Sequence, residues 1–311
     1  MGMKTIEKML LKAGDLVALA ATARKVSPGE VEASVRLLES WGLRVAVPEG
    51  LFEDDNQMAG SDARRAERFQ KLIDDREVRA IICARGGYGT VRMIDRVDFA
   101  PLARCPKWVV GYSDVTVLHS HIGRHCGIPT LHATMPLNVP ADACRTAYPA
   151  TESLRRMLFE GKVHYEFVNE GVVANRQGCC TAPVVGGNLS VLYSLLGSAS
   201  DIDTEDRILL LEDLDEYLYH IDRMMMALRR AGKLQGLRGL LVGAMSDMHD
   251  NAVPFGRTAE EIVRDAVADY GYPVAFNCLF GHIGTENRAL PLGVETKVRV
   301  ASDSVAIDVG I

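Results

Sequence analysis

The chain has 311 residues, of which 48% are hydrophobic and 24% are charged, enough to bury the core of one large or two medium domains. Its 35 basic and 41 acidic residues give a net charge of −6, and no block of lysines and arginines stands out. We therefore expect no nucleic-acid partner and predict a small molecule or peptide instead. The N-terminal stretch is charged throughout, and no segment reaches about 18 uninterrupted apolar residues, which predicts a soluble, cytoplasmic protein without a membrane partner.

Strand-like and helix-like segments alternate in the first part of the chain. The predicted strands are 15–21, 43–47, 79–84 and 107–111, and the predicted helices are 27–42 and 61–75. Ser27, Pro28 and Glu30 form the pattern of an N-cap, a proline in the first turn and a capping box. This order is typical of a parallel sheet with helices on both faces. Ligands bind such sheets at the carboxyl ends of the strands, where RGGYG (85–89) and GYSD (111–114) should lie.

After about residue 140 the pattern changes, which predicts a crossover into a smaller α/β domain. The predicted helices are 151–162, 188–197, 217–232 and 258–271, and the predicted strands include 207–212, 239–245, 294–300 and 303–309. Short strands and turns are expected between 163 and 188. We divide the chain into a domain at 1–145, a crossover linker at 146–180 and a second domain at 181–311.

The seven cysteines are scattered, and none has the spacing CxxC. This argues against a disulfide framework and a structural zinc site, and it predicts buried, reduced thiols. His121 and His125 are four residues apart on an expected helix, but no carboxylate at ligand spacing accompanies them. They are weak evidence for a metal, and we expect none.

The segment WVVGYSDV (108–115) has the outline of a strand, a sharp turn and a helix. A serine nucleophile needs such a turn to expose its hydroxyl group, and Ser113 is the candidate. The match to GxSxG is imperfect because Val115 stands in place of the last glycine. An alternative is that Ser113 or Asp114 is an ordinary helix N-cap.

The loop CARGGYGT contains two adjacent glycines, Gly86 and Gly87. Their backbone N–H groups can form a concave site for an oxyanion or a carboxylate, although a plain tight turn is the alternative. No GK[ST] follows, and the GxGxxG spacing is missing, so a nucleotide cofactor is not expected.

The histidine and the acid that a serine nucleophile requires have candidates in the second half. His282 lies between glycines in a loop after a strand-like segment. Glu212 ends an apolar strand, where an acid is costly to bury without a partner, and His282 could be that partner. The competing acids Asp213, Asp215 and Glu216 are expected to be solvated.

Several motifs together resemble one family. They are ARGGYG (84–89), GYSDVT (111–116), GGNLS (186–190), LLEDLDEYLYHIDRM (210–224) and GHIGTENRALPLG (281–293). In this order they resemble the LD-carboxypeptidases, a family of serine peptidases also called muramoyltetrapeptide carboxypeptidases. The resemblance implies a flavodoxin-like or amidotransferase-like N-terminal domain that carries the nucleophile, and a C-terminal domain that carries the other two members of a triad.

The resemblance also implies residue roles. Ser113 is expected as the nucleophile, Glu212 as the orienting acid and His282 as the general base. The backbone N–H groups of Asp114 and of Gly87 or Gly86 are expected to form the oxyanion hole. The implied reaction releases terminal D-alanine from murein tetrapeptides during cytoplasmic recycling, without a metal or another cofactor, in a homodimer.

An exopeptidase must recognise a free carboxylate at the end of its substrate. Because Arg85 and the N–H groups of Gly86 and Gly87 are expected beside the elbow, we hypothesise that they contact this carboxylate.

Two other functions remain open. The microcin-immunity branch of the same family would share the triad and cleave acyl or peptidyl nucleotides, but no aromatic-rich insertion suggests a purine site. A non-enzymatic peptide-binding protein would use Ser113 as a helix cap. The chain lacks the phosphate-binding fingerprint of a nicotinamide-dependent oxidoreductase, so this third function is not expected.

Overall fold

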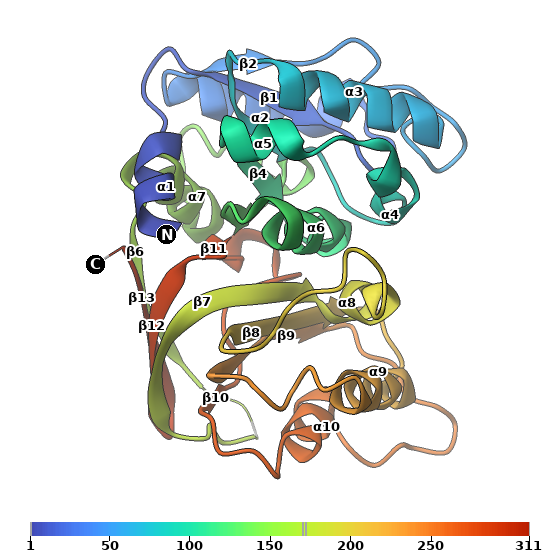
Figure 1. The fold of residues 1–311 in the computed structure, drawn as a ribbon, viewed down its shortest axis with the longest axis vertical. Coiled ribbons are helices and arrows are strands. Elements are labelled where there is room, and N and C mark those ends of the chain that lie inside the picture. The colour runs from blue at the N-terminus through green and yellow to red at the C-terminus, as the bar shows by residue number, and fades with distance from the viewer. Residues whose placement is uncertain (1, 170, 172, 311) are drawn as a thin grey trace.

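The computed structural model describes residues 2–169, 171 and 173–310 and has an α/β fold built on two sheets (Figure 1). The N-terminal sheet has the order β11-β5-β4-β3-β1-β2, and only β11 runs antiparallel to its neighbour. Its strands are β1 (Leu16–Ala20), β2 (Arg44–Ala46), β3 (Val78–Cys83), β4 (Trp108–Gly111), β5 (Thr130–His132) and β11 (Leu290–Leu292).

Helices cover both faces of this sheet, as the alternating pattern predicts. The helices of this half are α1 (Gly2–Met9), α2 (Pro28–Ser40), α3 (Asp62–Asp74), α4 (Thr90–Met93), α5 (Ala100–Arg104) and α6 (Thr116–Cys126). Val17 of β1 belongs to the same buried cluster as Val31 of α2, whereas the next residue, Ala18, belongs to the cluster that contains Phe69 of α3. Successive strand residues therefore pack against opposite helical layers. The capping box predicted at Ser27 is present.

The C-terminal sheet has the order β10-β9-β8-β7-β12-β13-β6. It is parallel from β10 to β7 and antiparallel from β7 to β6. Its strands are β6 (Val163–Val168), β7 (Gly178–Asn188), β8 (Ile208–Leu214), β9 (Gly239–Ser246), β10 (Val274–Ala275), β12 (Glu295–Val300) and β13 (Ser304–Val309). The long β7 joins the two parts because it pairs with β8 along one half and with β12 along the other.

The remaining helices are α7 (Pro149–Glu160), α8 (Leu189–Leu195), α9 (Leu218–Arg230) and α10 (Ala259–Ala266). The predicted helices at 151–162, 188–197, 217–232 and 258–271 correspond to these four. The segment 146–180 contributes β6 and the beginning of β7 to the C-terminal sheet. The division into 1–145, 146–180 and 181–311 remains a prediction.

β11 was not predicted. Its three residues come from the C-terminal half of the chain, yet they extend the N-terminal sheet beside β5. The strand is too short to show a period, and its pairing depends on the tertiary structure. Figure 1 shows this edge strand on the side of the N-terminal sheet nearest β7, so a segment from the C-terminal half of the chain is part of the N-terminal sheet.

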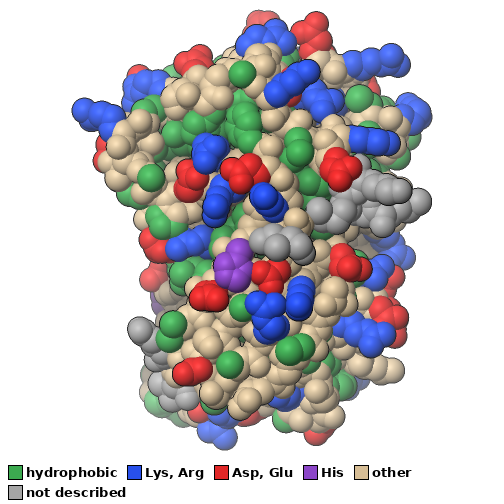
Figure 2. Space-filling view, turned by 90° about the vertical axis from the view of Figure 1, so that its left-hand side faces the viewer, with side chains coloured by type: hydrophobic (Ala, Val, Ile, Leu, Met, Phe, Trp, Pro, Cys, Tyr) green, Lys and Arg blue, Asp and Glu red, His purple; other side chains and the backbone are tan. Residues whose placement is uncertain are grey.

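The side chains on one face of the molecule carry charges of both signs (Figure 2). Figure 2 shows acidic and basic side chains interspersed on the face that includes β6 and β13. Among the described residues, no helix is long and apolar enough to span a bilayer. All seven cysteines are free, but Cys144 and Cys179 are exposed, so the prediction that the thiols are buried is wrong for these two.

Candidate active site

The turn after β4 holds Ser113 in an unusual backbone conformation. Its φ is 63°, in the left-handed region that residues other than glycine rarely adopt. A short 3-10 helix (Ser113–Val115) follows and leads into α6. No side chain caps either helix, so Ser113 and Asp114 are not ordinary N-caps. The geometry agrees instead with a nucleophile elbow, in which a strained turn exposes the serine hydroxyl.

The glycine-rich loop after β3 lies directly against this elbow. β3 and β4 are parallel neighbours, so the loops that follow them meet at one edge of the sheet. A Cβ atom on Gly86 would lie 2.8 Å from the Ser113 Cβ, 2.9 Å from its Oγ and 3.3 Å from the Asp114 backbone nitrogen. The approach requires glycine, and it places Gly86 beside Ser113 and the Asp114 backbone nitrogen.

Glu212 and His282 are in direct contact, as expected from the sequence. The Nδ1 of His282 lies 2.7 Å from the Oε2 of Glu212, whose side chain is fully buried. The carboxylate can only accept, so the imidazole carries its proton on Nδ1 and leaves Nε2 free to accept one. Gly281 makes room for this pair, because a Cβ there would lie 2.5 Å from the same Oε2.

The environment of His282 sets its basicity. Burial lowers the pKa of His282. The hydrogen bond to Glu212, the negative charge of Glu212 and the charge of Asp213 raise the pKa, and together they outweigh burial, so the net shift is upward from the ordinary value. An imidazole of this kind is a stronger base than a free histidine, which suits proton abstraction near neutral pH.

Contacts between the two halves bring the elbow and the histidine together. The rings of Tyr112 and His282 have centroids 4.8 Å apart, so His282 packs on the residue that precedes Ser113. The backbone N–H of Asn188, at the end of β7, donates to the Oγ1 of Thr116 at the start of α6 (3.0 Å). Asn188 pairs with Glu212 in the sheet, so this contact also fixes the acid relative to the elbow.

Asp213 corrects one expectation. It was expected to be solvated, but it is 1% exposed and accepts hydrogen bonds from the Asn188 side chain (2.9 Å) and from the backbone N–H groups of Ser190 (2.8 Å) and Leu214 (2.9 Å). Burial, with the charge of Glu212, raises the pKa of Asp213 to about 7. Because Asp213 follows Glu212 in β8, its side chain lies on the opposite face and anchors the cap of α8 rather than the histidine.

The other acids differ from each other in exposure. Asp215 is largely exposed and pairs with His249, in agreement with the expectation of a solvated side chain. Glu216 is only 21% exposed and pairs with the Nδ1 of His220.

Arg85 lies beside the site but already has partners. Its Nη1 donates to the carbonyl oxygen of Lys25 (3.2 Å) and lies 3.7 Å from Glu30. Gly87 is exposed, and a Cβ atom there would lie 2.2 Å from the Cδ of Arg24. A second arginine, Arg24, therefore lies against the glycine loop that contains Arg85, and the sequence patterns indicated only Arg85.

His121 and His125 serve a structural contact. The Nδ1 of His121 lies 2.9 Å from the Ser200 hydroxyl oxygen, and the Nε2 of His125 lies 2.8 Å from the carbonyl oxygen of Ala199. Both rings thus join α6 to the loop after α8. Within the described part of the chain, no three histidine, cysteine or acidic residues are grouped so as to hold a metal ion.

Sequence reasoning also missed His119, which supports the elbow from below. It is 4% exposed, and its Nε2 lies 2.9 Å from the carbonyl oxygen of Gly111. Burial lowers the pKa of His119 to about 4, so the ring is neutral at physiological pH. Its spacing from Ser113 is the sole signal in the sequence, and that spacing does not reveal the contact.

Two family models match this chain. Residues 15–133 match the LD-carboxypeptidase N-terminal domain, and residues 181–298 match the LD-carboxypeptidase C-terminal domain. A "Probable murein peptide carboxypeptidase" of Bacillus subtilis is 32% identical over 97% of this chain and 94% of its own length. The chain belongs to the LD-carboxypeptidase family.

A second relative in this family is the "Murein tetrapeptide carboxypeptidase" of Pseudomonas aeruginosa, which is 27% identical over 89% of this chain and 91% of its own length. Two solved structures share the fold. The muramoyltetrapeptide carboxypeptidase from Oxalobacter formigenes has a TM-score of 0.84 at 23% identity and covers 95% of this chain and 99% of its own. The microcin C7 self immunity protein MccF, in complex with aspartyl sulfamoyl adenosine, has a TM-score of 0.81 at 18% identity, covering 96% and 97%.

Proposed function

We propose that the protein is a serine-type LD-carboxypeptidase, which hydrolyses the bond between the L-centre of a diamino acid and terminal D-alanine in murein tetrapeptides. The observation that carries the proposal is the left-handed backbone of Ser113 at the end of β4. The bond between His282 and Glu212 supports it. The names of the relatives in Bacillus subtilis and Pseudomonas aeruginosa support the choice of murein peptides.

The proposed mechanism follows from the protonation states. The Nε2 of His282 accepts the hydroxyl proton of Ser113 while Oγ attacks the scissile carbonyl carbon. The backbone N–H groups of Asp114 and of Gly86 or Gly87 stabilise the resulting oxyanion. His282 then donates the proton to the amine of D-alanine as the C–N bond breaks, which leaves an acyl-enzyme. Water, deprotonated by His282, hydrolyses this ester and restores Ser113.

The free carboxylate of D-alanine needs a partner at the glycine loop. We assign this role to Arg85 or to the N–H groups of Gly86 and Gly87, since all three lie beside the elbow. Arg85→Ala should raise the KM for a tetrapeptide far more than it slows cleavage of an ester that lacks the carboxylate. Equal losses on the two substrates would contradict the assignment.

A second candidate is the hydrolysis of acyl or peptidyl nucleotides, favoured by the shared fold with MccF. The same Ser113, Glu212 and His282 would act, and only the substrate pocket would differ. For the carboxypeptidase we further propose a cytoplasmic role in murein recycling and a homodimeric state.

The deciding experiment is mass spectrometry of the purified protein with a murein tetrapeptide and, in parallel, with an aminoacyl sulfamoyl adenylate. We expect the tetrapeptide to lose one alanine and the adenylate to stay intact, with no turnover by Ser113→Ala. Cleavage of the adenylate alone would establish the second candidate. Turnover of neither substrate would favour a peptide-binding protein.

A further inference from the structure

A buried arginine outside the proposed triad lies beneath the glycine loop. Arg65 belongs to α3, and its side chain is fully buried. Its Nη1 donates to the carbonyl oxygens of Thr22 and, at 2.8 Å, of Gly89, and its Nε donates to the carbonyl oxygen of Gly60 at 3.2 Å. Its Nη2 pairs with Asp62. A buried guanidinium is costly unless its donors are satisfied, and here they hold three separate loops in place.

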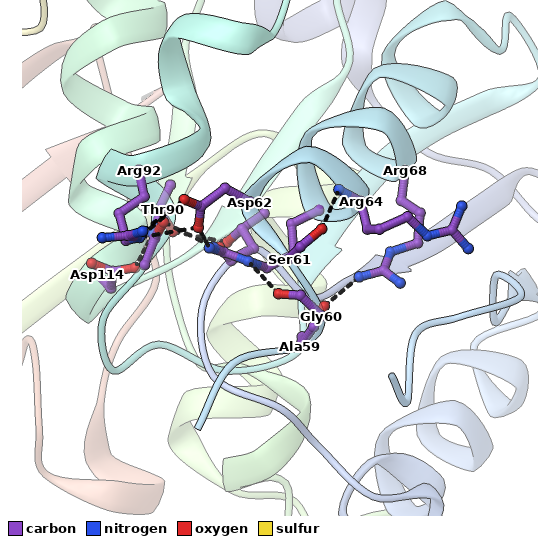
Figure 3. Close-up of polar contacts among 12 residues, drawn as sticks. Ala59, Gly60, Ser61, Asp62, Arg64, Arg68, Thr90, Arg92 and Asp114 are labelled. Atoms are coloured by element: carbon purple, nitrogen blue, oxygen red, sulfur yellow. Dashed lines mark hydrogen bonds and ion pairs between the residues drawn. The ribbon is translucent and has the colours of Figure 1, made fainter. Parts of the chain in front are cut away.

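One of these loops is held at both ends of a single peptide unit. Arg65 binds the carbonyl oxygen of Gly89, and the N–H of the same peptide, which belongs to Thr90, donates to the Oδ2 of Asp114 at 2.9 Å. Figure 3 shows Asp114 directed toward Thr90 from the elbow. Because Asp114 immediately follows Ser113, the peptide 89–90 connects the end of the glycine loop rigidly to the elbow.

The electrostatics of the two side chains fit this arrangement. Asp114 is 3% exposed, and burial raises its pKa, while the bonds from Thr90 and the charge of Arg65 act in the opposite direction. Burial lowers the pKa of Arg65, and the charges of Asp62 and Asp114 oppose that shift. Each group therefore offsets part of the cost of burying the other, with the peptide 89–90 between them.

We propose that the side chains of Arg65 and Asp114 are positioning groups that set the spacing between the two halves of the oxyanion hole. One half is the Asp114 N–H. The other is the N–H of Gly86 or Gly87, on the loop that ends at the peptide 89–90. The inference rests on the proposed function, and it adds a role for residues that do not touch the substrate. The two N–H groups must both lie about 2.7–3.1 Å from the oxyanion, so a small shift of the loop weakens one of the bonds.

Arg68 provides a matched control on the same helix. Its side chain is 12% exposed, and it too donates to backbone carbonyl oxygens, those of Gly50 and Ala59. It also pairs with Glu53. Figure 3 shows Arg68 on the side of α3 away from Asp114. Removing Arg68 costs folding stability through the same kind of contact without touching the glycine loop.

The experiment compares Arg65→Lys, Arg65→Gln and Arg68→Gln by kcat and KM on a murein tetrapeptide, with activity normalised to folded protein by circular dichroism. We expect Arg65→Gln to lower kcat 10- to 100-fold and to change KM less than threefold, because an oxyanion bond acts in the transition state. Arg65→Lys, which keeps the charge, should restore part of the loss. Arg68→Gln should keep kcat within twofold of the wild type.

A second pair of variants tests the contact between Asp114 and the N–H of Thr90. Asp114→Asn retains a side-chain oxygen that can accept from Thr90, and Asp114→Ala does not. We expect the alanine variant to lose at least 10-fold more kcat than the asparagine variant. The rate of inactivation by a serine-directed phosphonate, which also needs the oxyanion hole, should fall in parallel.

Two results would overturn the inference: an equal kcat in Arg65→Gln and Arg68→Gln, or equal losses in the two Asp114 variants. A failure of the proposed function would look different. The wild type would then release no D-alanine, and Ser113 would not react with the phosphonate.

Discussion

Substitution of Gly86 by alanine tests the elbow and the glycine loop together. The new Cβ would lie 2.8 Å from the Ser113 Cβ, whereas carbon atoms in contact are about 3.5–4.0 Å apart. The loop and Ser113 must therefore separate by about 0.7 Å or more. Gly86 is not in the left-handed region, so the effect is steric rather than conformational. Overpacking of this kind costs about 1–3 kcal/mol of folding stability.

The loss of activity should exceed the loss of stability. A displaced nucleophile or a lost oxyanion donor each lowers the rate by about 10²- to 10³-fold. We expect kcat/KM of Gly86→Ala on a murein tetrapeptide to fall by about that factor, measured as D-alanine released per folded enzyme. Gly123→Ala is the control, since a Cβ on this glycine of α6 would meet no atom within 4 Å. If Gly86→Ala retained wild-type kcat/KM, the assignment of the site would be refuted.

Three further predictions concern the second half of the chain. Glu212→Gln removes the hydrogen-bonded charge that raises the pKa of His282 and leaves the burial that lowers it. The acid limb of the pH profile of kcat/KM should therefore move to lower pH, and kcat should fall about 10²-fold or more. An unmoved acid limb would contradict the role of His282 as the base. Gly281→Ala should disrupt the contact between Glu212 and His282 and lower kcat. Gly284 also has a positive φ, but a Cβ there would have no atom within 4 Å, so Gly284→Ala should lower only the melting temperature. Similar kinetics in the two variants would argue against a steric effect on Glu212. The pKa of Asp213 is raised to about 7, above its unfolded value of about 3.9, so this group makes the free energy of unfolding fall as pH rises from about 4 to 7. In Asp213→Asn, the difference between the free energies of unfolding in urea at pH 4.5 and at pH 8 should therefore be smaller than in the wild type. An unchanged difference would show that Asp213 does not titrate in this range.

Local patterns predicted most of the elements. Ser27, Pro28 and Glu30 mark the beginning of α2 at the residue where it begins. The apolar segments 79–84 and 107–111 correspond to β3 and β4. These signals lie within a few residues of each other, so the sequence contains them in full. The contact between Glu212 and His282 was also predicted, because an acid in a buried strand needs a partner.

The remaining features depend on contacts between distant segments. Asp213 was expected to be solvated because it stands among other acids, and only the packing of α8 against β8 buries it. Arg65 looks like one of several arginines on an amphipathic helix, and nothing in its neighbourhood indicates that it reaches Thr22 and Gly89. The pairing of β11 with β5 likewise joins segments more than 150 residues apart.

The proposed mechanism depends on Ser113 as a nucleophile that His282 activates. The most direct measurement is peptide mapping by mass spectrometry after reaction with a serine-directed phosphonate. We expect one added phosphonyl group on the peptide that contains Ser113, no labelling of Ser113→Ala, and slow labelling of His282→Ala. A wild-type protein that stays unlabelled, or a label that persists in Ser113→Ala, would show that Ser113 is not the nucleophile.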